Sequence, residues 1–119
     1  REPLEIGAMQ LAAVQILGEH DFTSFSKKNK SKINETFVRI VDRAQWRRVG
    51  DTVQLEITAN AFTHQMVRSL VGMFVEIGRG RRRPDEMGEV LQAMSRMAVP
   101  SPAPPQGLEL TRAHYRSDV

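Results

Sequence analysis

The stretch from residue 53 to residue 77 changes its hydrophobic period halfway, and this change limits the possible folds more than any other feature. In its first part, polar residues alternate with Val53, Leu55, Ile57 and Ala59. Such alternation is typical of a strand with one face in water. Further on, the spacing becomes helical, and one face collects Phe62, Met66, Leu70, Met73, Phe74 and Ile77. We therefore predict a strand that leads into an amphipathic helix, capped by Thr63 and ended by Gly78.

The segments before this stretch supply partners for it. Residues 36–48 are rich in β-branched and aromatic side chains and precede the turn signal Gly50-Asp51. This pattern predicts a second strand, which forms a hairpin with the first. Residues 4–17 carry apolar residues at steps of three and four, so we predict a mostly buried helix that Gly18 ends.

The segments after it predict one more helix and one more strand. Pro84 suits the start of a short helix, with Asp85 and Glu86 in the first turn, where the helix dipole favours negative charge. The proline-rich run 99–107 cannot be regular structure, because proline lacks a backbone donor, and we interpret it as a stiff connector. Residues 108–115 predict the last strand. The order α, β, β, α, α, β predicts an α+β fold, with helices packed on one face of a mainly antiparallel sheet.

The composition fits a single globular domain over residues 1–119, with 40% hydrophobic and 26% charged residues. The absence of cysteine excludes disulfides, thiolate metal sites and cysteine nucleophiles. No apolar run approaches the roughly 18 residues that a membrane helix needs, so we expect no membrane contact and a cytoplasmic location. The chain begins with Arg1, which suggests a piece of a longer polypeptide.

Basic residues gather in two segments that we predict to be loops. The first cluster contains Lys27, Lys28, Lys30 and Lys32, and the second contains Arg79, Arg81, Arg82 and Arg83. Clusters of this kind favour contact with a phosphate backbone. The alternative interpretation is that both are ordinary solvated loops.

Arg68 stands among apolar residues of the predicted helix. The helical period places it just beyond the apolar face, in a stripe with His64 and Val71. One interpretation is a guanidinium that borders the core and reaches water. The other is a cation that points into a cleft and pairs with a carboxylate or phosphate. For Asn60, before the helix, we weigh a capping role against contact with RNA.

Three sequence segments and Trp46 together resemble the C-terminal half of the tRNA pseudouridine synthase A family. They are "LEIGAMQLAAVQILGEHDFTSF", Trp46, "ITANAFTHQMVRSLVGMFVEIGRG" and "PPQGLELTRAHY", in family-like order and spacing. The resemblance implies half of a pseudouridine synthase fold, ferredoxin-like, with its first strand missing. It also implies an enzyme that isomerises uridine to pseudouridine in the anticodon stem-loop of tRNA, with no metal or cofactor.

The resemblance assigns roles to particular residues. Arg68 would pair with a catalytic aspartate of the N-terminal half, which this chain lacks, so the chain alone is expected to be inactive. Leu108 would pack on the target base, and His64 and the two basic clusters would face RNA. Phe22 and Phe25 would shape the cleft wall, or would be ordinary core aromatics. The expected partners are tRNA, the N-terminal half of the protein, and a second copy that pairs through an uncovered sheet edge.

Three other classes of function compete with this hypothesis. The strongest is a noncatalytic RNA-binding module that grips phosphates with the two basic clusters. A metal-dependent hydrolase would use His20, His64 and His114, but their spacing matches no helical ligand pair. A structural adaptor would use residues 66–77 as a binding face, although core packing explains those residues more simply.

Overall fold

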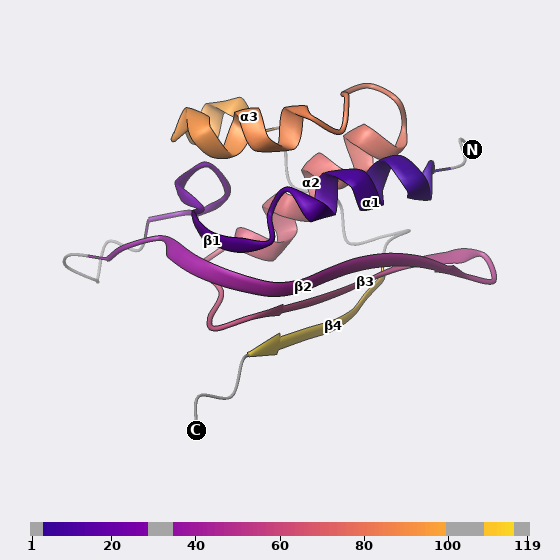
Figure 1. Cartoon of the computed structure of the whole chain (residues 1–119), viewed down its shortest axis with the longest axis horizontal. Helices are drawn as coiled ribbons and strands as arrows, with labels where there is room; N and C mark the ends of the chain where they lie inside the picture. Colours follow the sequence, from indigo (N-terminus) through magenta and orange to yellow (C-terminus); the bar gives the residue numbers. More distant parts are fainter. Residues whose placement is uncertain (1–3, 29–34, 100–108, 116–119) are drawn as a thin grey trace.

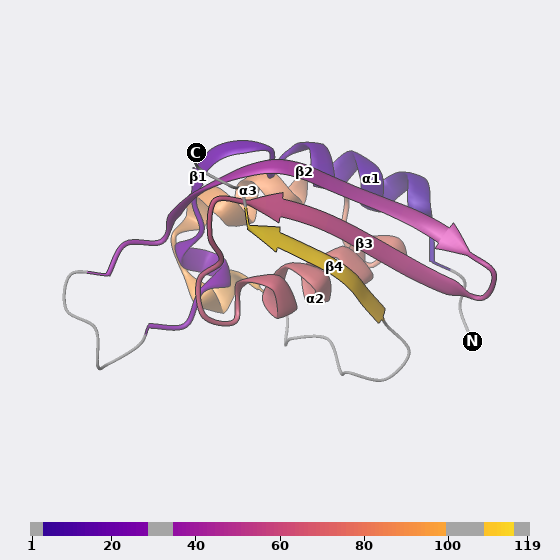
Figure 2. The ribbon, with the colours of Figure 1, turned by 90° about the horizontal axis from the view of Figure 1, so that it is seen from below.

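The fold consists of a four-stranded sheet with three α-helices on one of its sides (Figure 1). The computed structural model describes residues 4–28, 35–99 and 109–115, the last range as backbone alone. The elements are α1 (Ile6–Val14), β1 (Gly18–Asp21), the 3-10 turn η1 (Thr23–Phe25), β2 (Val38–Val49), β3 (Thr52–Ala59), α2 (Met66–Gly78), α3 (Glu86–Ala93), the 3-10 turn η2 (Arg96–Ala98) and β4 (Glu109–Tyr115). Figure 2 views the sheet from its open face, with the helices behind it.

The strands lie in the order β1-β2-β3-β4, and the sheet is mainly antiparallel, as predicted. β2 and β3 form the predicted hairpin, in which Trp46 lies opposite Leu55. β4 pairs with β3 in parallel, because two helices and a connector lie between them and return the chain to the same end of the sheet. The α+β fold class is therefore confirmed.

The first strand of the sheet, β1, was not predicted. Its four residues, Gly18–Asp21, pair with Val38–Val41 of β2. They show no alternation of apolar and polar side chains, so no local pattern indicates a strand here. The strand forms by pairing with β2, which lies further along the chain. Gly18 has φ of +92°, a conformation that glycine adopts easily, and this turns the chain from α1 into β1.

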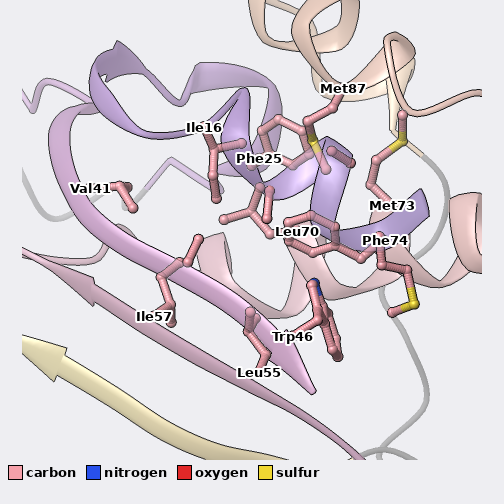
Figure 3. Packing of buried hydrophobic residues seen from close by; sticks show 14 of the residues in the cluster. Ile16, Phe25, Val41, Trp46, Leu55, Ile57, Leu70, Met73, Phe74 and Met87 are labelled. Atoms are coloured by element: carbon pink, nitrogen blue, oxygen red, sulfur yellow. The ribbon is translucent and has the colours of Figure 1, made fainter. Parts of the chain in front are cut away.

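The hydrophobic core fills the space between the helices and the sheet (Figure 3). The predicted inward residues of β3 are all buried, and so are five of the six residues predicted for the apolar face of α2; Phe62 is half-buried. Trp46 of β2 meets Phe74 of α2 edge-on, with ring centroids 5.3 Å apart. A bulge between Val41 and Arg43 restores the inward direction for Ala44 and Trp46.

The helix α1 is shorter and less buried than the sequence predicts. Met9, Ala12 and Ala13 are buried, but Leu11, Val14 and Leu17 are 63%, 56% and 38% exposed, so the prediction of a mostly buried helix over residues 4–17 was wrong for these three. The helix packs against the rest of the molecule with one side only. That side includes the polar Gln10, whose amide accepts from the N–H of Trp46 (2.8 Å) and donates to the carbonyl of Ala44 (3.2 Å).

The start of α2 differs from the prediction. Thr63 is not the cap, because the helix begins at Met66 and the N-cap position is Gln65, which has φ of +68° and makes no side-chain capping bond. Thr63 is buried, and its hydroxyl is hydrogen-bonded to that of Ser26. Its carbonyl accepts from the N–H of Met66 at 3.2 Å. The Thr63 side chain is therefore engaged in a tertiary hydrogen bond with Ser26 and does not cap the helix.

α3 begins at Glu86, two residues after Pro84, so of the two acidic residues predicted for its first turn only Glu86 lies there. Asp85 directly precedes the helix, and Glu86 lies in the first turn, where its carboxylate accepts from the N–H of Arg83 at 2.6 Å. The two residues therefore stabilise the helix start. Within the described residues, no helix has the length and the apolar character to span a bilayer.

Candidate functional site

Arg68 lies in the first turn of α2 and is exposed to solvent. Its neighbours Met66 and Leu70 are buried, whereas Val67 and Val71 are half-buried, so the guanidinium borders the core as the helical period predicts. Within the described part of the chain, it has no hydrogen-bonding or ion-pair partner. A guanidinium in this position can bind a carboxylate or phosphate that belongs to another part of the protein or to a ligand. The positive end of the helix dipole adds to the attraction.

The first basic segment lies beside the start of α2. The N–H of Lys27 donates to the carbonyl of His64 at 2.9 Å, which joins two segments that are far apart in the sequence. Lys27, Lys28 and His64 are all exposed. The structure therefore brings three residues of the predicted RNA-binding set close to the helix turn that carries Arg68. Lys30, Lys32 and Leu108 fall outside the described residues.

The second basic cluster lies at the opposite end of α2, roughly 20 Å away along a helix of this length. Glu76 pairs with Arg79 (3.8 Å) and Arg81 (3.3 Å). Arg82 is half-buried and donates to the carbonyl of Ala98 at 3.3 Å. These partners compensate part of the positive charge, so this cluster attracts a phosphate less than its sequence suggests.

Arg83 completes this cluster and is compensated as well. It pairs with Asp85 (3.1 Å) and Glu89 (3.7 Å), and its side chain is 68% exposed. The nearby carboxylates, above all Asp85, raise the pKa of Arg83. Because the pair with Asp85 is exposed on both sides, salt screens it and its contribution to stability is small.

Phe22 and Phe25 are fully buried, and both belong to the main core. This is the arrangement of ordinary core aromatics, the alternative that the sequence left open for them. Their burial fixes the segment between β1 and Lys27. Ser24, which lies between the two in the sequence, donates its hydroxyl hydrogen to the carbonyl of Val90 at 2.7 Å and so ties this segment to α3.

Asn60 does not cap α2, because its side-chain oxygen bonds to β2 instead. Its side-chain oxygen accepts from the N–H of Ile40 at 2.9 Å, while its own N–H donates to the carbonyl of Ile40 at 3.0 Å. The residue thus extends the β2–β3 pairing by one step beyond Ala59. This contact fixes the direction in which the chain leaves the sheet toward α2.

On β2 and β3 the open face of the sheet is polar. Arg43, Gln45 and Arg47 are exposed on β2, and Arg43 donates to Glu56 of β3 at 2.8 Å and to Gln45 at 2.6 Å. No helix of the described residues covers this face (Figures 1 and 2). A face with charged and amide groups suits contact with another polar surface more than contact with lipid.

A family model described as tRNA pseudouridine synthase matches residues 12–116. Curated proteins named tRNA pseudouridine synthase A are similar to the chain along nearly all of its length. The one from Halalkalibacterium halodurans is 44% identical over 108 residues, which are 91% of this chain and 40% of that protein. The one from Acidiphilium cryptum is 41% identical over 99% of the chain and 46% of its own length, and the one from Zymomonas mobilis is 37% identical over 96% and 46%.

The matched region defines the chain as an α+β module of an RNA-modifying class of proteins. The chain belongs to the tRNA pseudouridine synthase family, which confirms the resemblance found in the sequence. It spans less than half the length of these relatives.

Proposed function

We propose that this chain is part of an enzyme that isomerises uridine to pseudouridine in the anticodon stem-loop of tRNA. The chain supplies one wall of the active site. The observation that carries the proposal is Arg68, an exposed guanidinium that has no partner in the described residues and stands at the start of a helix otherwise packed into the core. Membership of the family and the names of the relatives support the choice of reaction.

In the proposed reaction the target base leaves the helical stack and enters a cleft between this chain and the other half of the protein. The glycosidic bond between N1 of the base and the ribose breaks, the ring turns, and a new bond joins C5 of the base to the same ribose carbon. C5 gives up its proton and N1 takes one up, so substrate and product are isomers. The reaction therefore requires no oxidant, and no group is lost from the nucleoside. An aspartate of the other half acts on the substrate, and Arg68 keeps its carboxylate ionised and oriented.

Contact with tRNA begins at the first basic cluster, from Lys27 to Lys32, which we call the lysine-bearing segment. Lys27 and Lys28 are exposed next to the start of α2, so a phosphate bound there lies on the same side as Arg68. Lys30, Lys32 and His64 extend this contact. Leu108 packs on the base, and the buried rings of Phe22 and Phe25 support the wall from the core side.

The arginines between residues 79 and 83 provide a second, weaker contact, because Glu76 and Asp85 compensate them in part. Together with the lysine-bearing segment, they would let the protein grip the tRNA backbone at both ends of α2.

Two protein partners complete the proposal. The first is the N-terminal half of the same protein, which brings the aspartate. The second is another copy of the protein, so the enzyme works as a homodimer in the cytoplasm. Among the described strands, β4 is an edge strand with a free outer side, and such an edge favours pairing with another strand.

The proposal is tested by comparing this chain with the full-length protein in an isomerisation assay on tRNA. We expect pseudouridine from the full-length protein and none from the chain alone. The product should map to the anticodon stem-loop, and tRNA in which cytidine replaces those uridines should not react. Turnover by the isolated chain at the full-length rate would contradict the bipartite site. Salt-sensitive tRNA binding by the full-length protein, without any isomerisation, would instead favour the noncatalytic RNA-binding module.

A further inference from the structure

Two buried hydroxyls connect the lysine-bearing segment to the residues before α2. Ser26 and Thr63 are 4% and 6% exposed, and their oxygen atoms are hydrogen-bonded across a separation of 37 residues. Ser26 donates its hydroxyl hydrogen to the carbonyl of Phe22 at 2.6 Å. Because a hydroxyl group has only one hydrogen, Thr63 must be the donor between the two. The bond therefore depends on the hydroxyl of Thr63.

A second hydrogen bond lies directly beside the first. The N–H of Lys27 donates to the carbonyl of His64, so two successive residues of one segment are bonded to two successive residues of the other. Gln65 follows with φ of +68°. Residues other than glycine adopt this left-handed conformation at a cost, and it persists where the surroundings hold it. The two bonds hold the chain just before this strained residue.

We propose that Ser26 and Thr63 are positioning residues for the reaction. Their hydrogen bond fixes the first turn of α2, and with it the direction of Arg68, relative to the lysine-bearing segment. The inference rests on the proposed function, in which Arg68 meets an aspartate and the lysines meet tRNA. Positional errors of about 1 Å in a catalytic group can reduce a rate by about a hundredfold, so a small rotation of this turn matters.

The experiment uses the full-length protein and compares turnover with stability. Thr63→Val removes the hydroxyl and keeps the shape, whereas Thr63→Ser keeps the hydroxyl. Ser26→Ala is a second way to break the bond. The matched control is Ser24→Ala, because Ser24 is also fully buried in the same segment. Its hydroxyl bonds to Val90 and accepts from the N–H of Ser95 (3.1 Å), away from α2.

We expect Thr63→Val and Ser26→Ala to lower kcat by about tenfold or more, with KM for tRNA changed less than about twofold. Thr63→Ser should restore most of kcat. Ser24→Ala should lower Tm as much as Thr63→Val does and leave kcat near that of the wild type. All rates are measured well below the lowest Tm.

Three results would overturn the inference. The first is an unchanged kcat in Thr63→Val or Ser26→Ala when the wild type is active, which leaves the proposed function intact. The second is an equal loss of kcat in Ser24→Ala, which would show that stability alone is responsible. The third is an inactive wild-type protein, which would overturn the proposed function and this inference together.

Discussion

Gly78, the last residue of α2, lies so close to α1 that a side chain of any size must displace its neighbours. A methyl group at this position would lie 2.6 Å from Sδ of Met9, 3.0 Å from Cγ of Met9 and 3.2 Å from Cδ2 of Leu4. Carbon atoms in contact are normally about 3.5–4.0 Å apart. Met9 is fully buried, and the N–H of Glu5 donates to the carbonyl of Gly78 at 2.8 Å, so α1 cannot move away freely.

Gly78→Ala should therefore destabilise the protein. Overpacking of a core typically costs about 1–3 kcal/mol, and alanine in place of glycine in a helix regains at most about 1 kcal/mol. We expect a net loss of roughly 1–2 kcal/mol in the free energy of unfolding. Gly7 of α1 is the matched control, because it is exposed and nothing lies within 4 Å of an added Cβ. Gly7→Ala should stabilise the protein by up to about 1 kcal/mol.

Urea unfolding followed by circular dichroism measures both variants. A double-mutant cycle with Met9→Ala identifies the contact, because the methyl group that Gly78→Ala introduces would occupy part of the cavity that Met9→Ala creates. The double variant should then be more stable than the sum of the single changes predicts, by about 1 kcal/mol or more. A stabilising Gly78→Ala, or additive effects in the cycle, would refute the packing of α1 against the end of α2.

Three further changes test other parts of the structure. Met94→Gly should raise the free energy of unfolding by about 1 kcal/mol, because Met94 ends α3 with φ of +51° and is 50% exposed; thermal unfolding measures it. Asn60→Ala should destabilise the protein by about 1–2 kcal/mol and speed hydrogen exchange at the Ile40 amide; an unchanged exchange rate would contradict this role. Glu76→Gln frees the two arginines that it pairs with, so tRNA binding should strengthen a few-fold in low salt and change little in high salt; no change in low salt would exclude those arginines from the RNA contact.

The hairpin and α2 could be predicted from the sequence because burial on one side imposes a strong period. β3 is buried at every second residue, and α2 places a broad apolar face in the same core, so both patterns are visible within a short window. α1 was harder to predict in detail. Leu11 and Val14 are apolar and exposed, whereas Gln10 turns inward and bonds to the backbone of β2. No rule based on hydrophobicity predicts a polar residue on the inner side and two apolar residues on the outer side.

Tertiary contacts explain most of what the sequence did not predict. β1 forms because its backbone pairs with that of β2. Thr63 bonds to Ser26, although its position before a helix suggests a cap. In the candidate site, the period of α2 placed Arg68 at the border of the core correctly. Its partner could not be predicted from local patterns, because the proposed aspartate belongs to another part of the protein. The role of Arg68 therefore remains a prediction.

Single-turnover isomerisation of tRNA by the full-length protein tests the central claim about Arg68 most directly. Arg68→Ala should lower the rate by about a hundredfold or more, because it removes the cation that orients the carboxylate. Arg68→Lys should recover only part of it, since lysine cannot make a bidentate pair. Arg96→Ala, which removes an exposed arginine of η2, should react at the wild-type rate. If Arg68→Ala reacted within twofold of the wild type, Arg68 would be a surface cation without a role in the reaction.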